Sequence, residues 1–271
     1  MTTTPTSDAA APPVVDRETW LRKRDELLVR EKAHTREGDA IAAARRQLPM
    51  TLMPAVTVRG PGGDIPLVEV FEGRRMLIAY FHMWHDGNPY EHQCEGCTFS
   101  TCHMQTLDYL HARDVTYAVF CEGPYDESAP FAEFMGYRFP WYSAKDSDPA
   151  LADGRHFGFI ACYLRDGDNV YETYWTTGRG VEALMTTYHA LDLTVYGRQE
   201  NWENSPEGWP RVNGHPWRLD GRPTAQWSRP ASHRDDVLIV VELGKRLVGR
   251  AGVRPRHRGI MRSRWATQRP A

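Results

Sequence analysis

Long apolar runs are missing from this sequence. The longest, Met76–Phe81 and Val237–Val241, fall far short of the roughly 20 residues that a helix needs to cross a membrane. Residues 1–13 have neither a basic start nor an apolar core, so we expect no secretory signal and interpret residues 1–15 as a disordered arm. With 41% hydrophobic and 25% charged residues, the chain has the composition of an ordinary globular protein, and we expect no membrane partner.

Cysteine is scarce as well. The chain has five in 271 residues, an odd number, and three of them lie between positions 94 and 102. This clustering excludes a disulfide scaffold and predicts a cytoplasmic protein whose thiols react or are buried. Cys121 and Cys162 lie in apolar, strand-like runs, so we expect them to be inert core thiols.

Acidic residues are absent from the end of the chain. Nine Lys and Arg residues lie between Lys245 and Arg269 with no Asp or Glu, so this tail carries +9 although the whole chain carries −2. Such a tail can bind nucleic acid or an anionic membrane. No recognisable binding module accompanies it, and we favour a solvated terminus with no nucleic-acid partner. Residues 236–271 are thus predicted to be a short apolar element and a disordered basic tail.

A long helix is predicted near the start of the chain. Asp16 is a suitable N-cap, and the helix should end near Arg46, before Pro49. One face carries the apolar residues Trp20, Leu21, Leu27 and Leu28. We expect this stripe to pack on the domain; the alternative is a contact in a homodimer.

Strand-like and helix-like stretches then alternate up to residue 198, which predicts an α/β domain over residues 16–198 whose central sheet is covered on both faces. Residues 199–235 are rich in Trp, Pro and Gly without periodicity, so we expect an irregular wrap or linker. The expected strands are Ala55–Val58, Ile65–Phe71, Arg75–Trp84, Val115–Cys121 and a Phe157–Leu164/Asn169–Tyr174 hairpin; the expected helices are Thr98–Ala112, Asp126–Gly136 and Gly180–Leu191; and the candidate docking anchors of the wrap are Trp202, Trp209, Trp217 and Trp227.

Cys94 and Cys97 form a C-x-x-C pair between a predicted buried strand and a predicted helix. Only a thiolate attacks a disulfide, and the N-terminus of a helix favours a thiolate through its free N–H groups and dipole. We therefore interpret Cys94 as the exposed nucleophile and Cys97 as the more buried resolving thiol. Glu95, between them, opposes thiolate formation, and no cofactor is needed.

Histidines and tryptophans surround the pair. Protonated His85, His92 or His103 would favour a thiolate at Cys94. Trp84 and Trp141 can line a redox site, although a place in the core is an equally good interpretation of each.

Cys102 and His103 are not explained by a simple cysteine pair. They could supply a third redox thiol, or complete a zinc or copper site formed by Cys94, Cys97, Cys102 and His103. In a helix, however, Cys97 and Cys102 would point in different directions, which disfavours a tetrahedral site.

Several motifs resemble a thioredoxin-like family of unknown function that is labelled predicted dithiol-disulfide oxidoreductase and is related to the AhpC/TSA superfamily. The resemblance runs from about Trp20 to Trp209. It is carried by Tyr80–Met83, Cys94–Phe99, Leu110–Thr116, Met135–Gly136–Tyr137, Phe139–Pro140–Trp141, Leu164–Asp168, Tyr188–Leu193 and Gly197–Glu200. It implies a thioredoxin-like fold and places Cys94 and Cys97 at the paired-cysteine positions.

Two departures from related proteins are visible. Thioredoxin-like proteins usually have a cis-proline facing the site, and His156–Ile160 contains no proline. A peroxiredoxin nucleophile would need Thr three residues before Cys94, where Glu91 stands.

The sequence therefore predicts thiol–disulfide exchange with a protein or small-molecule thiol or disulfide. The alternatives are a Cys/His metal-binding module and a non-catalytic binding domain that keeps the fold.

Overall fold

The computed structural model describes residues 10–212 and 216–229. All of these residues belong to one compact unit. The predicted apolar element at 237–248, the basic tail and residues 1–9 of the predicted arm lie outside the described residues. Within the described ranges, no helix combines the length and apolar character required to span a membrane.

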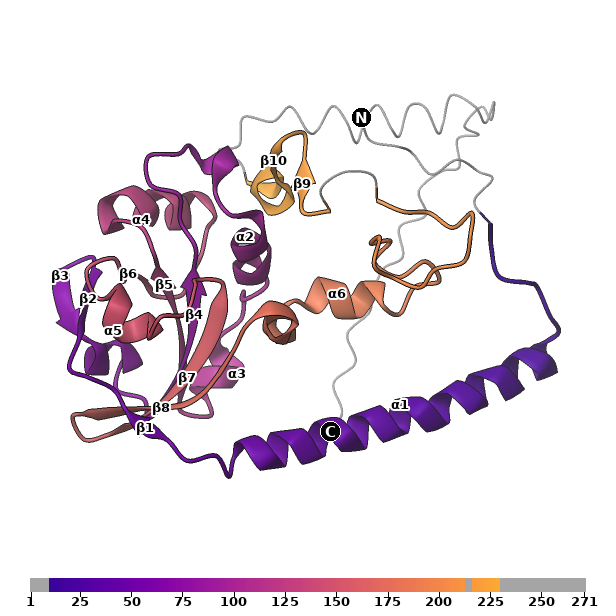
Figure 1. The fold of residues 1–271 in the computed structure, drawn as a ribbon, viewed down its shortest axis with the longest axis horizontal. Helices are drawn as coiled ribbons and strands as arrows, with labels where there is room; N and C mark the ends of the chain where they lie inside the picture. The colour runs from indigo at the N-terminus through magenta and orange to yellow at the C-terminus, as the bar shows by residue number, and fades with distance from the viewer. Residues whose placement is uncertain (1–9, 213–215, 230–271) are drawn as a thin grey trace, which may run out of the picture. The chain divides into compact units, whose positions relative to one another are not determined.

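An eight-stranded mixed sheet forms the centre of the domain, in the order β1-β8-β7-β4-β5-β6-β2-β3 (Figure 1). β4 pairs parallel with β5 and antiparallel with β7, and β7 and β8 form an antiparallel hairpin. The four strands β8-β7-β4-β5, with a helix linking β4 to β5, have the topology of a thioredoxin-like fold, so the predicted fold class is confirmed. The strands are β1 Thr51–Leu52, β2 Thr57–Gly60, β3 Gly63–Pro66, β4 Met76–His82, β5 Val115–Cys121, β6 Trp141–Ser143, β7 Phe159–Asp166 and β8 Asn169–Thr176.

The sheet separates two hydrophobic cores, and the side chains of β4 point alternately into one and the other. Leu77, Ala79 and Phe81 belong to one core, whereas Tyr80 belongs to the other, because successive side chains of a strand point to opposite faces. The first core is closed by η1 (Leu67–Phe71) and α5 (Asp148–Ala152), and the second by α2 (Glu95–Cys102), α4 (Tyr125–Phe134), η3 (Gly178–Leu184) and α6 (Thr186–Leu191). The predicted cover on both faces is thus present, and the C-x-x-C segment lies on the Tyr80 face.

The helix predicted over residues 98–112 is shorter than expected. α2 ends at Cys102, and a separate turn of helix, α3, covers Asp108–His111. Inside α2, the hydroxyls of Thr98, Ser100 and Thr101 donate to carbonyls four residues back, which weakens helix propagation. The Gln105 amide then donates to the Cys102 carbonyl at the end of the helix.

Two other predicted elements also change character. Ile65–Phe71 was expected to be one strand, but β3 ends at Pro66, which lacks an N–H group to continue a ladder, and η1 follows. The final predicted helix, residues 180–191, is divided at Met185 into η3 and α6, because Met185 has the non-helical angles φ −104° and ψ 76°.

α1 (Arg17–Arg45) begins as predicted, with the Asp16 carboxylate accepting the Thr19 backbone N–H at 2.8 Å. None of its residues is buried, however, and Trp20 and Leu27 are 46% and 47% exposed. The prediction that the apolar stripe packs on the domain is therefore wrong. The homodimer contact stays a prediction.

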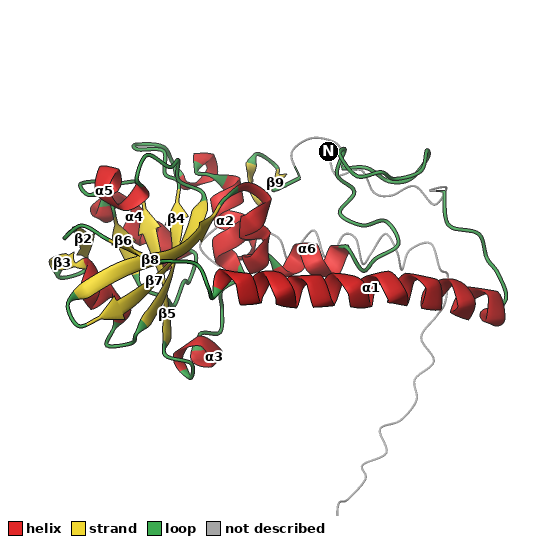
Figure 2. Ribbon diagram, turned by 60° about the horizontal axis from the view of Figure 1, so that its bottom comes forward, coloured by secondary structure: helices red, strands yellow, loops and turns green. Residues whose placement is uncertain are grey.

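The segment after residue 198 contains more structure than expected. β9 (Arg218–Leu219) and β10 (Arg222–Pro223) form a small hairpin, followed by η4 (Thr224–Ser228). Both β10 and η4 contact α2, and Figure 2 shows β9 beside that helix. The sequence missed this hairpin because each of its strands has only two residues, which is too short to establish a period.

Candidate active site

Cys94 is the N-cap of α2. Its sulfur accepts the backbone N–H of Cys97 at 3.5 Å, the place that a Ser or Asp oxygen takes in an ordinary N-cap. The residue has an extended backbone, with φ −60° and ψ 114°, so the chain turns into the helix at this point. The predicted placement of Cys94 just before the helix and Cys97 in its first turn is confirmed.

Cys97 lies beneath Cys94 and is only 2% exposed. Its sulfur accepts the Met83 backbone N–H at 3.3 Å, which connects α2 to the end of β4. The buried Tyr80 hydroxyl on β4 interacts with the sulfur of Cys97 and with Ser100. The Cys97 sulfur is thus contacted by the Met83 backbone and by the Tyr80 side chain.

The pKa values of the two thiols are shifted in opposite directions. The hydrogen bond from the Cys97 thiol, assisted by the Cys97 and Gly96 backbone N–H groups, outweighs burial and the Glu95 charge and lowers the pKa of Cys94 to about 7. The same contact, with burial and the charge of Cys94, raises the pKa of Cys97 well above its usual value. At neutral pH Cys97 therefore keeps its proton, and about half of Cys94 is thiolate.

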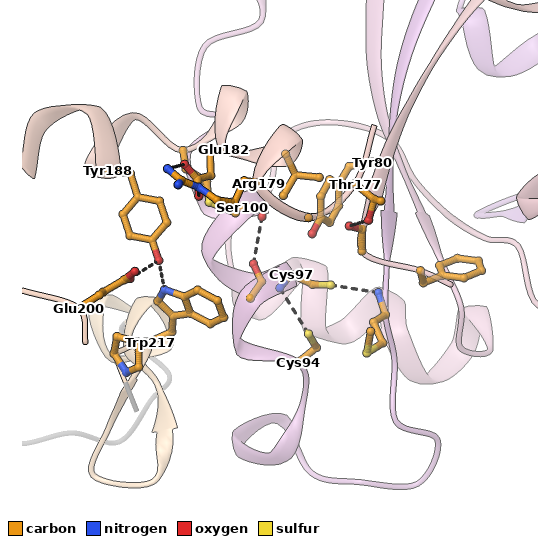
Figure 3. Close-up of a pocket in the computed structure, with 18 of the residues that line it drawn as sticks. Tyr80, Cys94, Cys97, Ser100, Thr177, Arg179, Glu182, Tyr188, Glu200 and Trp217 are labelled. Atoms are coloured by element: carbon orange, nitrogen blue, oxygen red, sulfur yellow. Dashed lines mark hydrogen bonds and ion pairs between the residues drawn. The ribbon is translucent and has the colours of Figure 1, made fainter. Parts of the chain in front are cut away.

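A cavity of about 880 Å³ adjoins the pair, and Cys94, Cys97 and Tyr80 are part of its wall (Figure 3). Much of the remaining wall comes from η3, α6 and the segment after residue 198, with Met83 and Phe157 among the other lining residues, and most of the lining side chains are apolar. Figure 3 shows Tyr188 and Trp217 pointing toward each other beside Glu200. The Tyr188 hydroxyl donates to the Glu200 carboxylate at 2.8 Å and accepts the Trp217 indole N–H, so three separate segments are joined at this end of the cavity.

The β9–β10 hairpin is attached directly to the C-x-x-C turn. Trp217 stacks on Phe99, with ring centroids 6.4 Å apart and planes 14° apart, and a Cβ placed on Gly96 would lie 3.4 Å from the Trp217 ring. Arg218 binds the Glu95 carboxylate and also donates to the backbone carbonyls of Glu91 and Gln93. These contacts hold the hairpin against the C-x-x-C turn, and the distance at Gly96 is that of an ordinary van der Waals contact.

The two tryptophans that could line the site, Trp84 and Trp141, lie in the core instead. Trp84 and Trp141 are buried, 4% and 6% exposed, and their indole N–H groups donate to Glu127 and to Ser128. Neither lines the cavity, so the structure gives them the core interpretation.

His85 and His92 are exposed and do not line the cavity either. His82, on the same strand as Tyr80, is fully buried, and burial lowers its pKa to about 3, so it is neutral. Burial also lowers the pKa of His103, which makes that residue a poorer source of positive charge than expected.

Cys102 and His103 face a second cavity of about 430 Å³. The Cys102 thiol donates to the Phe99 carbonyl at 3.1 Å, and burial raises its pKa to about 11. His103 Nδ1 donates to the same carbonyl at 2.6 Å, while its Nε2 accepts the Thr187 hydroxyl at 2.6 Å. These contacts make Cys102 a weak nucleophile near neutral pH and leave His103 engaged at both nitrogens.

The four residues of the metal alternative do not converge. Over residues 10–212 and 216–229, no three His, Cys, Asp or Glu side chains are grouped so that they could hold a metal ion. Cys97 and Cys102 are separated around α2, as the five-residue spacing suggests.

The sequence did not predict that several other residues belong to the site. Tyr80 was part of an expected apolar strand, and its hydroxyl gave no signal in that pattern. Glu182, Tyr188 and Glu200 lie about 90 to 100 residues from the cysteines along the chain. Trp202 and Trp217, which also line the cavity, had a signal as tryptophans in a segment without periodicity.

A family model described as "Bacterial protein of unknown function (DUF899)" matches residues 9–217. No curated protein matches the chain. Three solved structures illustrate its similarity to thioredoxin-like proteins.

The first is a provisionally named thiol:disulfide interchange protein DsbE from Chlorobium tepidum, with 16% identity over 53% of this chain and 98% of that one and a TM-score of 0.38. The second is peroxidoxin BcpB from Mycobacterium tuberculosis, with 17% identity over 53% of this chain and 97% of that one and a TM-score of 0.33. The third is an uncharacterized thioredoxin-like protein from Porphyromonas gingivalis, with 16% identity over 49% of this chain and 92% of that one and a TM-score of 0.34.

Proposed function

We propose that this chain, which belongs to the DUF899 family of bacterial proteins of unknown function, is a dithiol–disulfide oxidoreductase in which Cys94 attacks and Cys97 resolves. The proposal depends on one observation, the unequal acidity of two thiols that share a hydrogen bond at the start of α2. The pKa of Cys94 is lowered to about 7, whereas that of the buried Cys97 is raised well above its usual value.

A pKa near 7 suits the attacking thiol. At neutral pH about half of Cys94 is thiolate, while a thiolate of this basicity is still a good nucleophile. A much more acidic thiol would be ionised but less nucleophilic, and a much less acidic one would be mostly protonated. Cys121 and Cys162, whose pKa values burial raises to about 12 and about 11, are unsuited to this role.

The reaction proceeds in two exchanges. The Cys94 thiolate attacks one sulfur of a disulfide R–S–S–R′, forming a Cys94–S–S–R bond and releasing R′–S⁻, which takes a proton from water. Cys97 then loses its proton, attacks the Cys94 sulfur and releases R–S⁻. Two electrons pass from the dithiol to the disulfide, leaving a Cys94–Cys97 disulfide, and a dithiol reductant returns the pair to its starting state.

The residues around Cys97 support the second exchange. Once Cys94 is in a mixed disulfide, its negative charge is gone, which removes one cause of the high pKa of Cys97. The Tyr80 hydroxyl and the Met83 N–H both favour the Cys97 thiolate. Formation of the mixed disulfide therefore activates the thiol that resolves it.

We also place this reaction in the reducing cytoplasm. The five cysteines are odd in number and clustered in the sequence, which fits a compartment where thiols are kept reduced. The partner in the reaction is a thiol or disulfide compound.

The experiment compares Cys94→Ser, Cys97→Ser and the control Cys162→Ser in a single-turnover reaction of the reduced chain with a model disulfide. We expect no mixed disulfide with Cys94→Ser, a stable mixed disulfide on Cys94 with Cys97→Ser, and parental behaviour with Cys162→Ser. If Cys94→Ser reacts as fast as the parent, the mechanism is wrong, and a non-catalytic thioredoxin-like domain is the better interpretation.

A further inference from the structure

The segment after residue 198 changes what can reach Cys94. Trp217 packs against Gly96 and Phe99, and Arg218 binds both the Glu95 carboxylate and the carbonyls before Cys94. Gln226 adds a hydrogen bond to the Tyr90 carbonyl at 2.7 Å. The start of α2, which must be open if another polypeptide is to dock beside Cys94, is thus covered by the chain's own hairpin.

The cavity of about 880 Å³ is the remaining space beside Cys94 that a substrate can enter. Its volume lies within the range of about 300–1,000 Å³ typical of sites for drug-sized molecules. Cys94 is in its wall, so a disulfide bound at that end of the cavity can meet the nucleophile.

The lining indicates an apolar, aromatic ligand. Tyr188, Trp202 and Trp217 supply aromatic surface, and Met83, Val181 and Met185 supply aliphatic surface. Aromatic side chains bind flat rings by stacking and edge contacts.

The charged side chains of the lining are paired with protein groups. Arg179 binds Glu182 at 3.0 Å and lies over the Trp202 ring, with its guanidinium carbon 4.6 Å from the ring centroid. Glu200 accepts hydrogen bonds from Tyr188 and Trp202. A charged ligand would have to compete with these contacts, so the cavity favours a neutral one.

From these observations we infer that the substrate is a small, uncharged, aromatic or largely apolar disulfide, reduced to its thiols by the Cys94–Cys97 pair, and not a protein disulfide. This inference rests on the proposed function and names its substrate class. Cys94 forms a mixed disulfide with one half of the molecule and the other half leaves as a thiol. Cys97 then releases the first half, and a dithiol reductant restores the pair.

The test uses the full reduced chain and three disulfides: 4,4′-dithiodipyridine as a neutral aromatic probe, bis(2-hydroxyethyl) disulfide as a neutral non-aromatic one, and insulin as a protein disulfide. Each single-turnover rate constant is divided by that of the same disulfide with N-acetylcysteine thiolate, which removes differences in intrinsic reactivity. Rates are followed as a function of disulfide concentration.

We expect the rate with dithiodipyridine to saturate, because binding in the cavity precedes the exchange, and its normalised value to exceed that of insulin at least about ten-fold, a difference of roughly 1.4 kcal/mol. Trp202→Ala, at a side chain that is 57% exposed and therefore replaceable without loss of the fold, should raise the half-saturating concentration several-fold. The control is Trp175→Ala, a similarly exposed tryptophan that does not line this cavity and should change nothing.

The inference is overturned by an insulin rate that matches or exceeds the dithiodipyridine rate after normalisation, by a strictly linear concentration dependence, or by a Trp202→Ala variant that behaves like the parent. These outcomes differ from failure of the proposed function, in which Cys94→Ser reacts with all three disulfides as fast as the parent.

Discussion

Arg218 binds Glu95 through two nitrogens, Nη2 at 2.8 Å and Nε at 3.2 Å from the same carboxylate oxygen. These residues are 123 positions apart, and Glu95 directly follows the nucleophile. A carboxylate next to a thiol disfavours the thiolate, and Glu95 is among the groups that act against the low pKa of Cys94. The guanidinium therefore offsets a charge that would make Cys94 less reactive.

The first prediction concerns Arg218→Met. Loss of the guanidinium leaves the Glu95 charge less compensated, so the pKa of Cys94 should rise above about 7 and alkylation by iodoacetamide at pH 6.5 should slow by about two- to five-fold, since the pair is only partly buried. The measurement is the pH dependence of Cys94 alkylation, read by mass spectrometry of the peptide.

Two further variants make this test specific. Arg218→Met combined with Glu95→Gln should restore fast alkylation, because the opposing charge is then gone as well. Arg59→Met removes an exposed partner of Asp64 far from the site and should leave the pH profile unchanged. A parental profile for Arg218→Met would show that the hairpin has no electrostatic effect on Cys94.

The second prediction concerns Cys97→Ala. The hydrogen bond from the Cys97 thiol is the largest cause of the low pKa of Cys94, so its removal should raise that pKa from about 7 toward the value of a free thiol. In the parent, thiolate absorbance should rise through pH 7; in Cys97→Ala, the rise should come at higher pH. Cys162→Ala, which removes a thiol with a pKa of about 11, should leave the transition near pH 7 in place. An unchanged transition in Cys97→Ala would mean that the helix N-terminus alone sets the acidity of Cys94.

The fold class and the position of the cysteine pair could be predicted from the sequence, because both depend on patterns among residues close together in the chain. Arg75–Trp84 and Val115–Cys121 are apolar on both alternating faces, which is typical of central strands, and the pair lies between a strand and a helix. The strand bounds agree within two residues with β4 and β5. Patterns of this kind depend on residues that are close in the sequence.

The surroundings of the pair could not be predicted, because they are formed by contacts distant in sequence. Nothing near Arg218 indicates that it binds Glu95, and nothing near Tyr188 indicates that it meets Trp217. The end of α2 at Cys102 likewise depends on hydroxyl and amide side chains that compete for helix carbonyls, which an apolar period does not report.

The third prediction separates the two exchange steps. Tyr80→Phe removes a hydroxyl that favours the Cys97 thiolate, although the Cys94 contact, burial and the Cys94 charge keep the pKa of Cys97 high overall. One lost hydrogen bond of about 1 kcal/mol should slow resolution of the mixed disulfide by roughly five-fold and leave the first attack by Cys94 nearly unchanged. Acid quenching at short times, followed by mass spectrometry of the intact chain, should show more mixed disulfide than in the parent.

Tyr109→Phe, at a residue that is 75% exposed, is the control. Equal amounts of the intermediate in Tyr80→Phe and the parent would remove Tyr80 from the mechanism.

The last prediction concerns the buried Arg198, which supports the wall of the cavity. Its side chain is 4% exposed, forms ion pairs with Asp192 at 2.7 Å and Glu182 at 3.0 Å, and lies over the Tyr188 ring with its guanidinium carbon 4.0 Å from the ring centroid. Arg198→Met should lower the free energy of unfolding by about 1–2 kcal/mol, because the half-exposed Asp192 loses its partner while Glu182 keeps Arg179.

Arg179→Met is the matched control for Arg198→Met, since Arg179 binds the same Glu182 from a side chain that is 68% exposed. An exposed pair contributes less than about 1 kcal/mol, so this variant should unfold close to the parent in urea. The Asp192 pKa is lowered mainly by its hydrogen bond with Arg198, so the carboxylate stabilises the fold above its unfolded pKa and loses this effect as the pH falls through the lower folded value. The stability difference between the parent and Arg198→Met should therefore be largest near neutral pH and shrink in acid. A difference that does not change with pH would mean that Arg198 stabilises the wall by packing on Tyr188 and not by its charge.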